Sequence, residues 1–507
     1  MHRPARNTIQ AMPEHYDAVV VGTGSAGCVV AARLSARGSR SVLLLEAGPD
    51  LRADPPALMH DGWRTYRENG WGFESEPDEL GVCEPLYRGK VVGGTSWVTR
   101  FAMRGSPADF NLWARLGNDG WGFDDVLPYF IRIENDLDFG DRAWHGNAGP
   151  LPVTRYPELE PSEYESAAVA ALAGTGFAPV EDHNRPGALG FGRMPRNGRG
   201  GERVTGADTH CPVGGASQGV HLRDHAEVAE VVLEGRRAVG VRLLNGATIA
   251  ADWVVLSAGT YGSPAILLRS GIGPTDHLRA VDIPVRVELP GVGSNLADHP
   301  GFAIDPGLRG APGAAPRFFT LATWRSSLAA SSDGPDLALW VYDPIGASGA
   351  PSETSVVALL LTPRSRGSVR LRSADPTQPP RIELPGLREN ADVERLAEGA
   401  ARAVEVANHS AVRRLCANPP TPSVGKSKDL RDVITETVES FPHVVGTCAM
   451  GRQPDDGAVV DNSGCVHGTE CLSVVDASIF PTPSSGFPHI ITIMMAERIA
   501  EMLSPLL

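Results

Sequence analysis

The chain has 507 residues, 42% of them hydrophobic and 21% charged, so it is long and apolar enough for two or three globular units. Its formal net charge of −14 provides no basic face for sustained phosphate contact, which argues against a nucleic-acid partner. No apolar run reaches the length of a membrane span, and residues 1–15 lack the apolar stretch of a secretory signal.

Cysteine and lysine usage agree with a cytoplasmic location. Seven scattered cysteines without a Cys-x-x-Cys pair favour reduced thiols over a disulfide framework or a metal knuckle. Lysine occurs only at positions 90, 426 and 428, and this strong preference for arginine is typical of a GC-rich bacterial genome. We therefore expect a cytoplasmic bacterial protein.

The first strong motif lies at residues 16–27, where an apolar run precedes three glycines. The run is typical of a buried parallel strand, and Gly22, Gly24 and Gly27 match G-x-G-x-x-G. The first glycine of this motif allows a tight turn, the second lets backbone approach a pyrophosphate, and the third permits close helix packing. Residues 28–36 have the apolar spacing of a helix, whose N-terminus would face the phosphate.

A second apolar run, at residues 42–45, ends in Glu46. An acid about twenty residues after the glycines is the position from which a carboxylate accepts both ribose hydroxyls. Strand, glycines, helix, strand and acid in this order predict a dinucleotide site. The acid also disfavours a 2′-phosphate, and therefore NADP.

Motifs spread in order over the whole chain resemble those of the glucose–methanol–choline (GMC) oxidoreductases, which are FAD enzymes. They lie at Gly22–Gly27 with Leu45–Pro49, Arg88–Ser96, Ser257–Pro264, Ser270–Pro274, His443–Cys448 and Val475–Pro481. The resemblance implies an α/β fold, with a Rossmann-like FAD-binding domain and an interleaved α+β substrate domain built on an antiparallel sheet. FAD is the implied cofactor.

We expect the domains to be interleaved along the chain. The FAD-binding domain is assigned residues 1–155, 203–300 and 441–507, and the substrate domain residues 156–202 and 301–440. Within the latter, strand-like runs at 337–342, 355–361 and 367–371, a hairpin or short loop at 362–366 and an amphipathic helix at 392–407 suit a sheet backed by helices. The Gly/Ala/Pro-rich residues 306–316 predict a mobile loop at the pocket mouth.

The resemblance also implies which residues contact FAD. The bare backbone of Gly93 and Gly94 suits an approach to phosphate or isoalloxazine, and Val228 matches a position whose backbone contacts adenine in relatives. The predicted FAD contacts are Gly22, Gly24, Ser25, Ala26, Gly27, Glu46, Ala47, Arg88, Val92, Gly93, Gly94, Thr95, Trp97, Thr99, Val228, Ala258, Asp476, Ala477 and His489.

Oxidation of an alcohol needs a base for the hydroxyl proton and a flavin N5 to accept the hydride. A neutral imidazole suits the first task near pH 7. Two of the fourteen histidines fall on the motifs, and the residues alone favour a hydrogen-bonded core histidine over a catalytic one at each position. The resemblance implies that His443 is the base and that His489 contacts the substrate oxygen. We expect no metal, because His443, Cys448 and His489 lack compact ligand spacing.

The segment after the double glycine departs from the family pattern. Thr99 stands where relatives usually have asparagine, and bulky Trp97 stands where small residues are common. Threonine offers one hydroxyl near the flavin edge instead of an amide. The electron acceptor therefore stays open between dioxygen, a quinone and a small redox carrier such as the peptide-derived mycofactocin of some bacterial relatives.

Other protein classes share parts of this sequence pattern. Residues 215–219 match the hydrolase G-x-S-x-G, but a nucleophile elbow needs a strand before it and a helix after it. Three alternative functions remain on the expected fold: a hydroxynitrile lyase, a flavin photodecarboxylase and a non-catalytic flavin binder. Aromatic residues offer either a stacking surface for aromatic or sugar-like alcohols or plain sheet core: Phe318, Trp324, Trp340 and Tyr342. We expect FAD-dependent oxidation of a primary or secondary alcohol, a small-molecule substrate, to a carbonyl.

Overall fold

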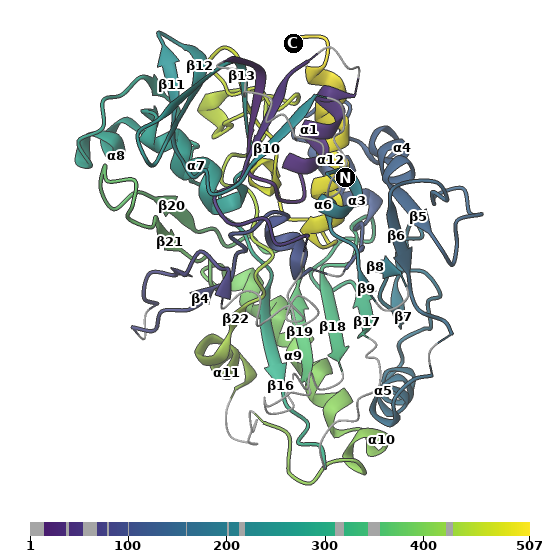
Figure 1. Cartoon of the computed structure of the whole chain (residues 1–507). Helices are drawn as coiled ribbons and strands as arrows, with labels where there is room; N and C mark the ends of the chain where they lie inside the picture. The colour runs from purple at the N-terminus through teal and green to yellow at the C-terminus, as the bar shows by residue number, and fades with distance from the viewer. Residues whose placement is uncertain are drawn as a thin grey trace, which may run out of the picture.

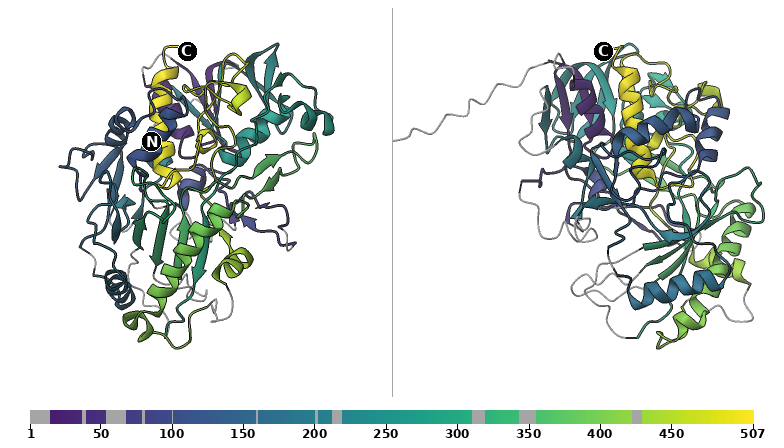
Figure 2. Two further views of the ribbon diagram at one scale, coloured as in Figure 1. Left: turned by 180° about the vertical axis from the view of Figure 1, so that it is seen from behind. Right: turned by 90° about the vertical axis from the view of Figure 1, so that its right-hand side faces the viewer.

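The structure, a computed structural model, describes residues 15–36, 40–53, 68–78, 81–99, 101–158, 160–199, 202–211, 219–309, 319–342, 355–421 and 429–507. One half of the molecule is built on a largely parallel sheet and the other on an antiparallel sheet (Figure 1). The two halves remain distinct along the long axis in both further views (Figure 2). Phe318 and most of the predicted motif at 215–219 and of the loop at 306–316 lie outside the described residues.

The first sheet has seven strands in the order β10-β2-β1-β13-β12-β11, with β23 paired to β13. The pairs β10/β2, β2/β1, β1/β13 and β13/β23 are parallel, whereas β11, β12 and β13 form an antiparallel edge. Its strands are β1 (His15–Val21), β2 (Val42–Leu45), β10 (Val220–Arg223), β11 (Val228–Glu234), β12 (Arg237–Leu243), β13 (Thr248–Leu256) and β23 (Leu472–Val474).

The apolar runs of the sequence become the centre of this sheet. Every residue of β2 is buried, as expected for a parallel strand that is covered on both faces. The helix α1 (Gly27–Ser35) follows the glycine turn and packs against α12 (Pro488–Leu503) (Figure 1). Arg33 of α1 pairs with the buried Glu497 of α12 at 2.7 Å. The Rossmann-like expectation is confirmed.

The second sheet is antiparallel throughout, in the order β22-β16-β19-β18-β17-β7. Helix α9 (Asn390–Asn408) packs against β16, β18 and β19, so the predicted sheet backed by a helix is present. The strands are β22 (Glu439–Ser440), β16 (Pro300–Ile304), β19 (Ser355–Leu360), β18 (Leu337–Tyr342), β17 (Phe319–Trp324) and β7 (Gly190–Arg193).

One local prediction differs from the structure. The run at 367–371 contains β20 (Ser368–Arg370), which pairs with β21 (Arg381–Glu383) in a separate two-stranded sheet. Residues 362–366 therefore form a loop and no hairpin, since β20 does not continue the sheet of β19. The buried Asp392 holds this loop by accepting hydrogen bonds from the backbone of Arg364 and Ser365.

The remaining elements surround the two sheets. The helices are η2 (Gly94–Trp97), α3 (Pro107–Arg115), α4 (Phe123–Ile133), α5 (Glu163–Gly174), α6 (Gly206–His210), α7 (Gly259–Arg269), α8 (Thr275–Ala280), α10 (Ser410–Arg413), α11 (Leu430–Thr437), η3 (Pro454–Asp456) and η4 (Ala477–Ile479). The short strands are β3 (Phe73–Glu74), β4 (Pro85–Leu86), β5 (Glu134–Asp136), β6 (Leu151–Thr154), β8 (Arg196–Arg199), β9 (Glu202–Arg203), β14 (Ile272–Gly273) and β15 (Val287–Glu288). Among the described residues, no helix combines the length and the apolar character that crossing a bilayer requires. The domain boundaries stay a prediction.

Candidate functional site

The turn after β1 is closed by backbone contacts that only glycine permits. Gly22 has φ +99°, and a Cβ there would lie 2.4 Å from the carbonyl oxygen of Ser257. A Cβ on Gly27 would lie 1.8 Å from the carbonyl oxygen of Gly22. At Gly24, by contrast, a Cβ would meet no described atom within 4 Å. The turn is tight on its inner side and open at Gly24, as a pyrophosphate requires.

The double-glycine loop faces this turn. A Cβ on Gly94 would lie 3.1 Å from Cα of Gly24, and the backbone N–H of Gly93 donates to Oγ1 of Thr23 at 3.0 Å. Two segments that the sequence analysis assigned to FAD therefore meet. The indole N–H of Trp97 donates back to the carbonyl of Val92, so this ring covers its own loop.

Glu46 lies buried at the end of β2, close to the glycine turn. Its carboxylate accepts hydrogen bonds from the backbone N–H of Thr23 at 3.2 Å and of Gly48 at 3.0 Å, and from the Thr23 hydroxyl. Burial raises the pKa of Glu46, and these hydrogen bonds act in the opposite direction. The carbonyl of Glu46 also accepts from Ala226, which places the start of β11, at Val228, near this acid.

Asp476 brings another pair of predicted contacts together. Its carboxylate accepts hydrogen bonds from the backbone N–H of Gly259 at 2.8 Å and of Ser478 at 2.8 Å, and from the hydroxyl of Ser263. Burial raises the pKa of Asp476 against these hydrogen bonds. Because β13 and β23 are paired in parallel up to Leu256 and Val474, Ala258 and Ala477 follow neighbouring strand ends.

His489 lies at the start of α12 and contacts the glycine turn. Its Nδ1 is 2.8 Å from the hydroxyl oxygen of Ser25. Its buried Nε2 has no hydrogen-bond partner in the described part of the chain. Burial, together with the positive charge of Arg203, lowers the pKa of His489 to about 4, so the ring is neutral near pH 7.

His443 lies after β22 and is held by two neighbouring residues. Its backbone N–H donates to the carboxylate of Asp298 at 2.7 Å, and its Nδ1 is 3.1 Å from Nδ1 of His299. Burial first, and then the charge that His299 carries when protonated and the charge of Arg88, place the pKa of His443 well below its usual value. His443 and His489 are not in contact among the described interactions, because the ring that packs on His443 from this segment is Phe487, at 4.4 Å between centroids.

Aromatic rings form a box around His443. Phe441 lies 5.1 Å from its ring, Trp340 lies 4.7 Å from Phe441, and Phe101 lies 4.8 Å from Trp340. We call Phe101, Trp340, Phe441 and Phe487 the aromatic box. Of the four aromatic residues singled out in the sequence, Trp340 joins this box, whereas Trp324 packs on Phe177 at 5.3 Å. The side chain of Tyr342 lies outside the described part.

The other predicted FAD contacts lie either near the glycine turn or near His443. Arg88 donates to the carbonyl of Pro442 at 3.0 Å and lies over the ring of Tyr261, so it supports the His443 segment. The Thr95 hydroxyl accepts a hydrogen bond from the backbone N–H of Gly89 at 3.3 Å. The backbone N–H of Thr99 donates to the Thr95 carbonyl at 3.3 Å. The remaining positions lie in the turn after β1 or just after β2: Ala26 and Ala47.

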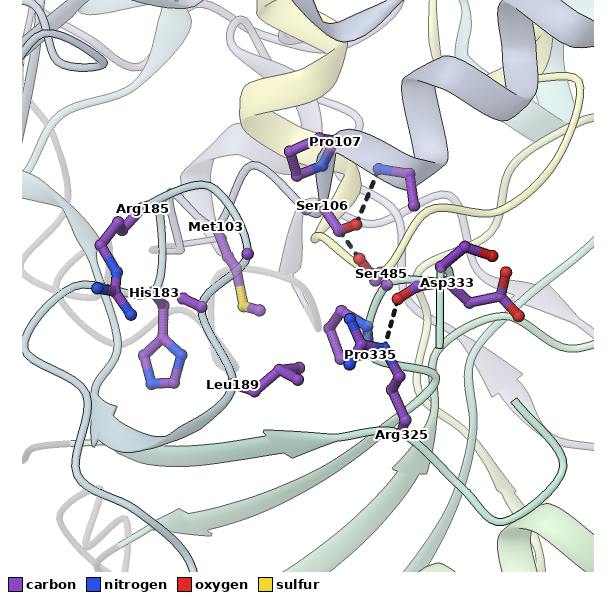
Figure 3. Close-up of a pocket in the computed structure, with 16 residues that line it drawn as sticks. Met103, Ser106, Pro107, His183, Arg185, Leu189, Arg325, Asp333, Pro335 and Ser485 are labelled. Carbon is purple, nitrogen blue, oxygen red and sulfur yellow. Dashed lines mark hydrogen bonds between the residues drawn. The ribbon is translucent and has the colours of Figure 1, made fainter. Parts of the chain in front are cut away.

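The structure contains a cavity of about 150 Å³. Met103, Ser106 and Ser485 are among the residues that line it (Figure 3). Met103 lines this cavity and also packs in the apolar cluster that contains Trp340 and Phe487. The polar lining of the cavity includes the hydroxyls of Ser106 and Ser485. The backbone N–H of Ser106 donates to Oγ of Ser485 at 3.1 Å, which fixes the segment leading to Phe487.

One group among the described residues has the spacing of metal ligands: Glu134, Asp136 and His145. Its carboxylates already pair with arginines, because Arg104 bonds to Glu134 and Arg155 bonds to Asp136. His145 is 2.7 Å from Glu134 and also 3.0 Å from Asp182. This buried ionic cluster therefore links segments of the fold by charge pairing.

Sequence reasoning missed His299 and three members of the aromatic box. Phe101, Phe441 and Phe487 come from separate parts of the chain, and no spacing in the sequence indicates that they meet. A signal for His299 does exist, because it directly follows Asp298 and precedes a strand. A paired acid and histidine at a strand end is a pattern worth testing as a site.

The residues of the glycine turn fit FAD. The open backbone at Gly24 and the facing Gly94 suit a pyrophosphate, and hydrogen bonds from Thr23 and Gly48 hold the buried carboxylate of Glu46 beside this turn. The unpaired Nε2 of the buried His489 is a polar atom that a bound group would satisfy.

Comparisons with known proteins agree with this geometry. The N-terminal and C-terminal profiles described as GMC oxidoreductase match residues 16–301 and 363–496. The 5-(hydroxymethyl)furfural oxidase of Methylovorus sp. (strain MP688) is 34% identical over 96% of this chain and 98% of its own. The oxygen-dependent choline dehydrogenase of Rhizobium rhizogenes (strain K84 / ATCC BAA-868) is 33% identical, over 96% and 95%.

A solved structure shows the same fold. The crystal structure of pyridoxine 4-oxidase from Mesorbium loti superposes with a TM-score of 0.86 at 28% identity, covering 96% of this chain and 98% of that one. Sequence, geometry and comparisons thus agree over nearly the full length. The chain belongs to the GMC oxidoreductase family, and its cofactor is FAD.

Proposed function

We propose that this protein oxidises a primary or secondary alcohol to a carbonyl compound, with His443 as the base. The hydroxyl proton passes to Nε2 of His443, the carbinol carbon gives up a hydride, and the C–O single bond becomes a carbonyl. FAD, when bound, supplies the two-electron acceptor for that hydride. The relatives named above act on 5-(hydroxymethyl)furfural, choline and pyridoxine according to their names, which supports an alcohol substrate.

The observation that carries the proposal is the state of His443. Burial keeps its pKa well below the usual value, so the imidazole is neutral and able to accept a proton at neutral pH. Its Nδ1 is engaged by His299, whereas Nε2 makes no hydrogen bond to a described residue. A ring with one nitrogen held and the other available is suited to general-base catalysis.

The aromatic box supports a flat, apolar substrate body. Trp340, Phe441 and Phe487 pack around His443 in mutually tilted or edge-on orientations. An aromatic ring or a short alkyl chain beside the carbinol would gain stacking energy there. We propose that aromatic primary alcohols are oxidised faster than sugar alcohols. The same rings would also attract a quaternary ammonium group, so choline is the informative competitor.

The decisive test is anaerobic mixing of the flavin-loaded protein with an alcohol panel in the dark. Benzyl alcohol should bleach the flavin, and benzyl alcohol deuterated at the carbinol carbon should bleach it more slowly. If no alcohol bleaches the flavin while light releases carbon dioxide from a carboxylic acid, the function is photodecarboxylation. Release of cyanide from a cyanohydrin without flavin turnover would indicate a lyase.

The electron acceptor is tested in the same preparation. Oxygen added after bleaching should restore the colour with release of peroxide if the protein is an oxidase. Slow recovery that a quinone accelerates indicates a dehydrogenase. We propose the dehydrogenase, because Thr99 and Trp97 change the usual residues of the segment after the double glycine.

A further inference from the structure

His299 is tied to His443 through backbone and side chain. The carboxylate of Asp298 accepts hydrogen bonds from the backbone N–H of His299 and of His443, each at 2.7 Å. The two imidazole rings are nearly perpendicular, with an interplanar angle of 88°, and their Nδ1 atoms are 3.1 Å apart. One acid thus aligns two histidines that share a single hydrogen bond.

The protons of this pair follow from its hydrogen-bond partners. Nε2 of His299 is 3.1 Å from the carbonyl oxygen of Ser484, and a carbonyl only accepts, so this nitrogen carries a proton. Burial lowers the pKa of His299 to about 4 and outweighs its hydrogen bonds to the backbone of Ser484 and Leu361, so the ring is neutral near pH 7. With the proton on Nε2, its Nδ1 bears a lone pair. The shared hydrogen bond then requires a proton on Nδ1 of His443. Nε2 of His443 is left without one.

We propose that His299 is a positioning residue, which holds His443 in the tautomer with a protonated Nδ1 and a bare Nε2. This inference rests on the proposed role of His443 as the base. The tautomer of a histidine is set by the hydrogen bond that its other nitrogen makes, and here that bond goes to His299. When His443 accepts the substrate proton, its Nδ1–H becomes the donor of a charge-assisted hydrogen bond to His299, which stabilises the imidazolium.

Other charged groups surround the pair. Asp298, whose pKa burial raises to about 6, accepts a hydrogen bond from the backbone N–H of His443, and the charge of Arg88 disfavours the imidazolium of His443. Glu84 is linked to this region through the backbone N–H of Ser440 at 3.4 Å. None of these groups bonds to the ring nitrogens of His443, so the tautomer depends on His299.

Two substitutions separate positioning from structural support. His299→Leu removes the acceptor and keeps an apolar side chain of similar size, whereas His299→Asn places an amide oxygen near the position of Nδ1. The first readout is the nitrogen chemical shifts of ¹⁵N-histidine-labelled holoenzyme, with the His443 signals assigned by their loss in His443→Gln. The second is the rate and substrate dependence of anaerobic flavin reduction by benzyl alcohol.

In the wild type, His443 should show a protonated Nδ1 and an unprotonated Nε2. We expect His299→Leu to invert this pattern and to slow flavin reduction by about 10- to 100-fold, with KM nearly unchanged. His299→Asn should restore the wild-type tautomer and most of the rate. A wild-type His443 protonated on Nε2, or a His299→Leu variant with unchanged tautomer, would overturn the proposal.

The tautomer readout needs no substrate, so it also distinguishes the two possible failures. If no alcohol reduces the wild-type flavin, the proposed function fails while the tautomer of His443 is still measured. If His299→Leu does not fold, the wild-type spectrum and His299→Asn still decide the matter.

Discussion

The hydroxyl oxygen of Ser25 lies 2.8 Å from Nδ1 of His489, although 464 positions separate the two residues. This contact joins the glycine turn after β1 to the first turn of α12. The two histidines assigned from the motifs are therefore held differently. His489 is attached to the cofactor turn, whereas His443 lies among the aromatic rings.

The first prediction concerns flavin retention by His489. We expect His489→Ala to weaken FAD binding by about 0.5–1.5 kcal/mol, because it removes the partner of the half-buried Ser25 hydroxyl in the glycine turn. His443→Ala should retain its flavin. The measurement is the flavin-to-protein ratio after extensive dialysis, followed by titration with FAD. Equal retention in the two variants would contradict this separation.

The second prediction concerns Glu46. Glu46→Ala should weaken FAD binding by about 1–3 kcal/mol, because it removes a buried acceptor that suits the ribose hydroxyls. The matched control is Glu230→Ala, which removes a partly exposed acid of the same sheet that pairs with Arg242. Fluorescence titration of the apoprotein with FAD compares the two. A preparation that ignores FAD and binds NAD would refute the cofactor site.

The third prediction concerns the pH dependence of flavin reduction. The rate should rise with pH as His443 loses its proton, and because its pKa lies well below 6.5, the rate should be level near neutral pH. His443→Ala should slow reduction by about 10²- to 10⁴-fold and remove this dependence. Asp298, whose pKa burial raises to about 6, also titrates below neutral pH. Stopped-flow profiles of Asp298→Asn therefore separate the two groups.

The fourth prediction concerns the aromatic box. Trp340→Ala should raise KM for benzyl alcohol by about 3- to 10-fold, since one aromatic contact contributes about 0.5–1.5 kcal/mol. Trp324→Ala is the control, because this residue belongs to the adjacent strand β17 and packs on Phe177. Steady-state kinetics with benzyl alcohol and choline compare the variants. An equal rise of KM in Trp340→Ala and Trp324→Ala would show that the aromatic box does not bind the substrate.

The fifth prediction concerns the stability of the ionic cluster. Burial alone would lower the pKa of His145, but hydrogen bonds to Asp182 and Glu134 outweigh it and the pKa is raised. The stability from this pair is therefore complete below about pH 6.5 and is lost as pH rises through the folded-state pKa of His145. We expect His145→Gln to lower Tm more at pH 6 than at pH 9. A difference in Tm that is the same at both pH values would contradict the role given to His145.

Asp182 contributes the opposite pH dependence of stability to the same cluster. Burial raises its pKa, but His145 and Arg155 outweigh burial and hold it below the usual value. Its contribution is present above about pH 4 and is lost as pH falls through the lowered pKa. The difference in Tm between the wild type and Asp182→Asn should therefore become smaller on strong acidification.

The sequence predicted the elements that local rules determine. The strand before Gly22, the all-apolar run at 42–45 and the amphipathic helix at 392–407 have periodicities or turn residues that specify them. The box around His443 was not predictable, because Phe101, Trp340 and Phe487 meet only through tertiary packing. The partner strand of 368–370 was missed for the same reason, since short strands have little pairing preference of their own.

The parallel sheet has a consequence for biosynthesis. Among the described strands β1 is synthesised first and has its neighbour β2 close behind it, but its other neighbour, β13, begins only at Thr248. At 5–20 residues per second, β1 waits roughly 10–50 s for that neighbour. The contact of Ser25 with His489 can form only later, once the first turn of α12 has been synthesised. The nascent chain therefore exposes the edge of β1 that faces β13 during this time, and the glycine turn is joined to α12 only after His489 has been added.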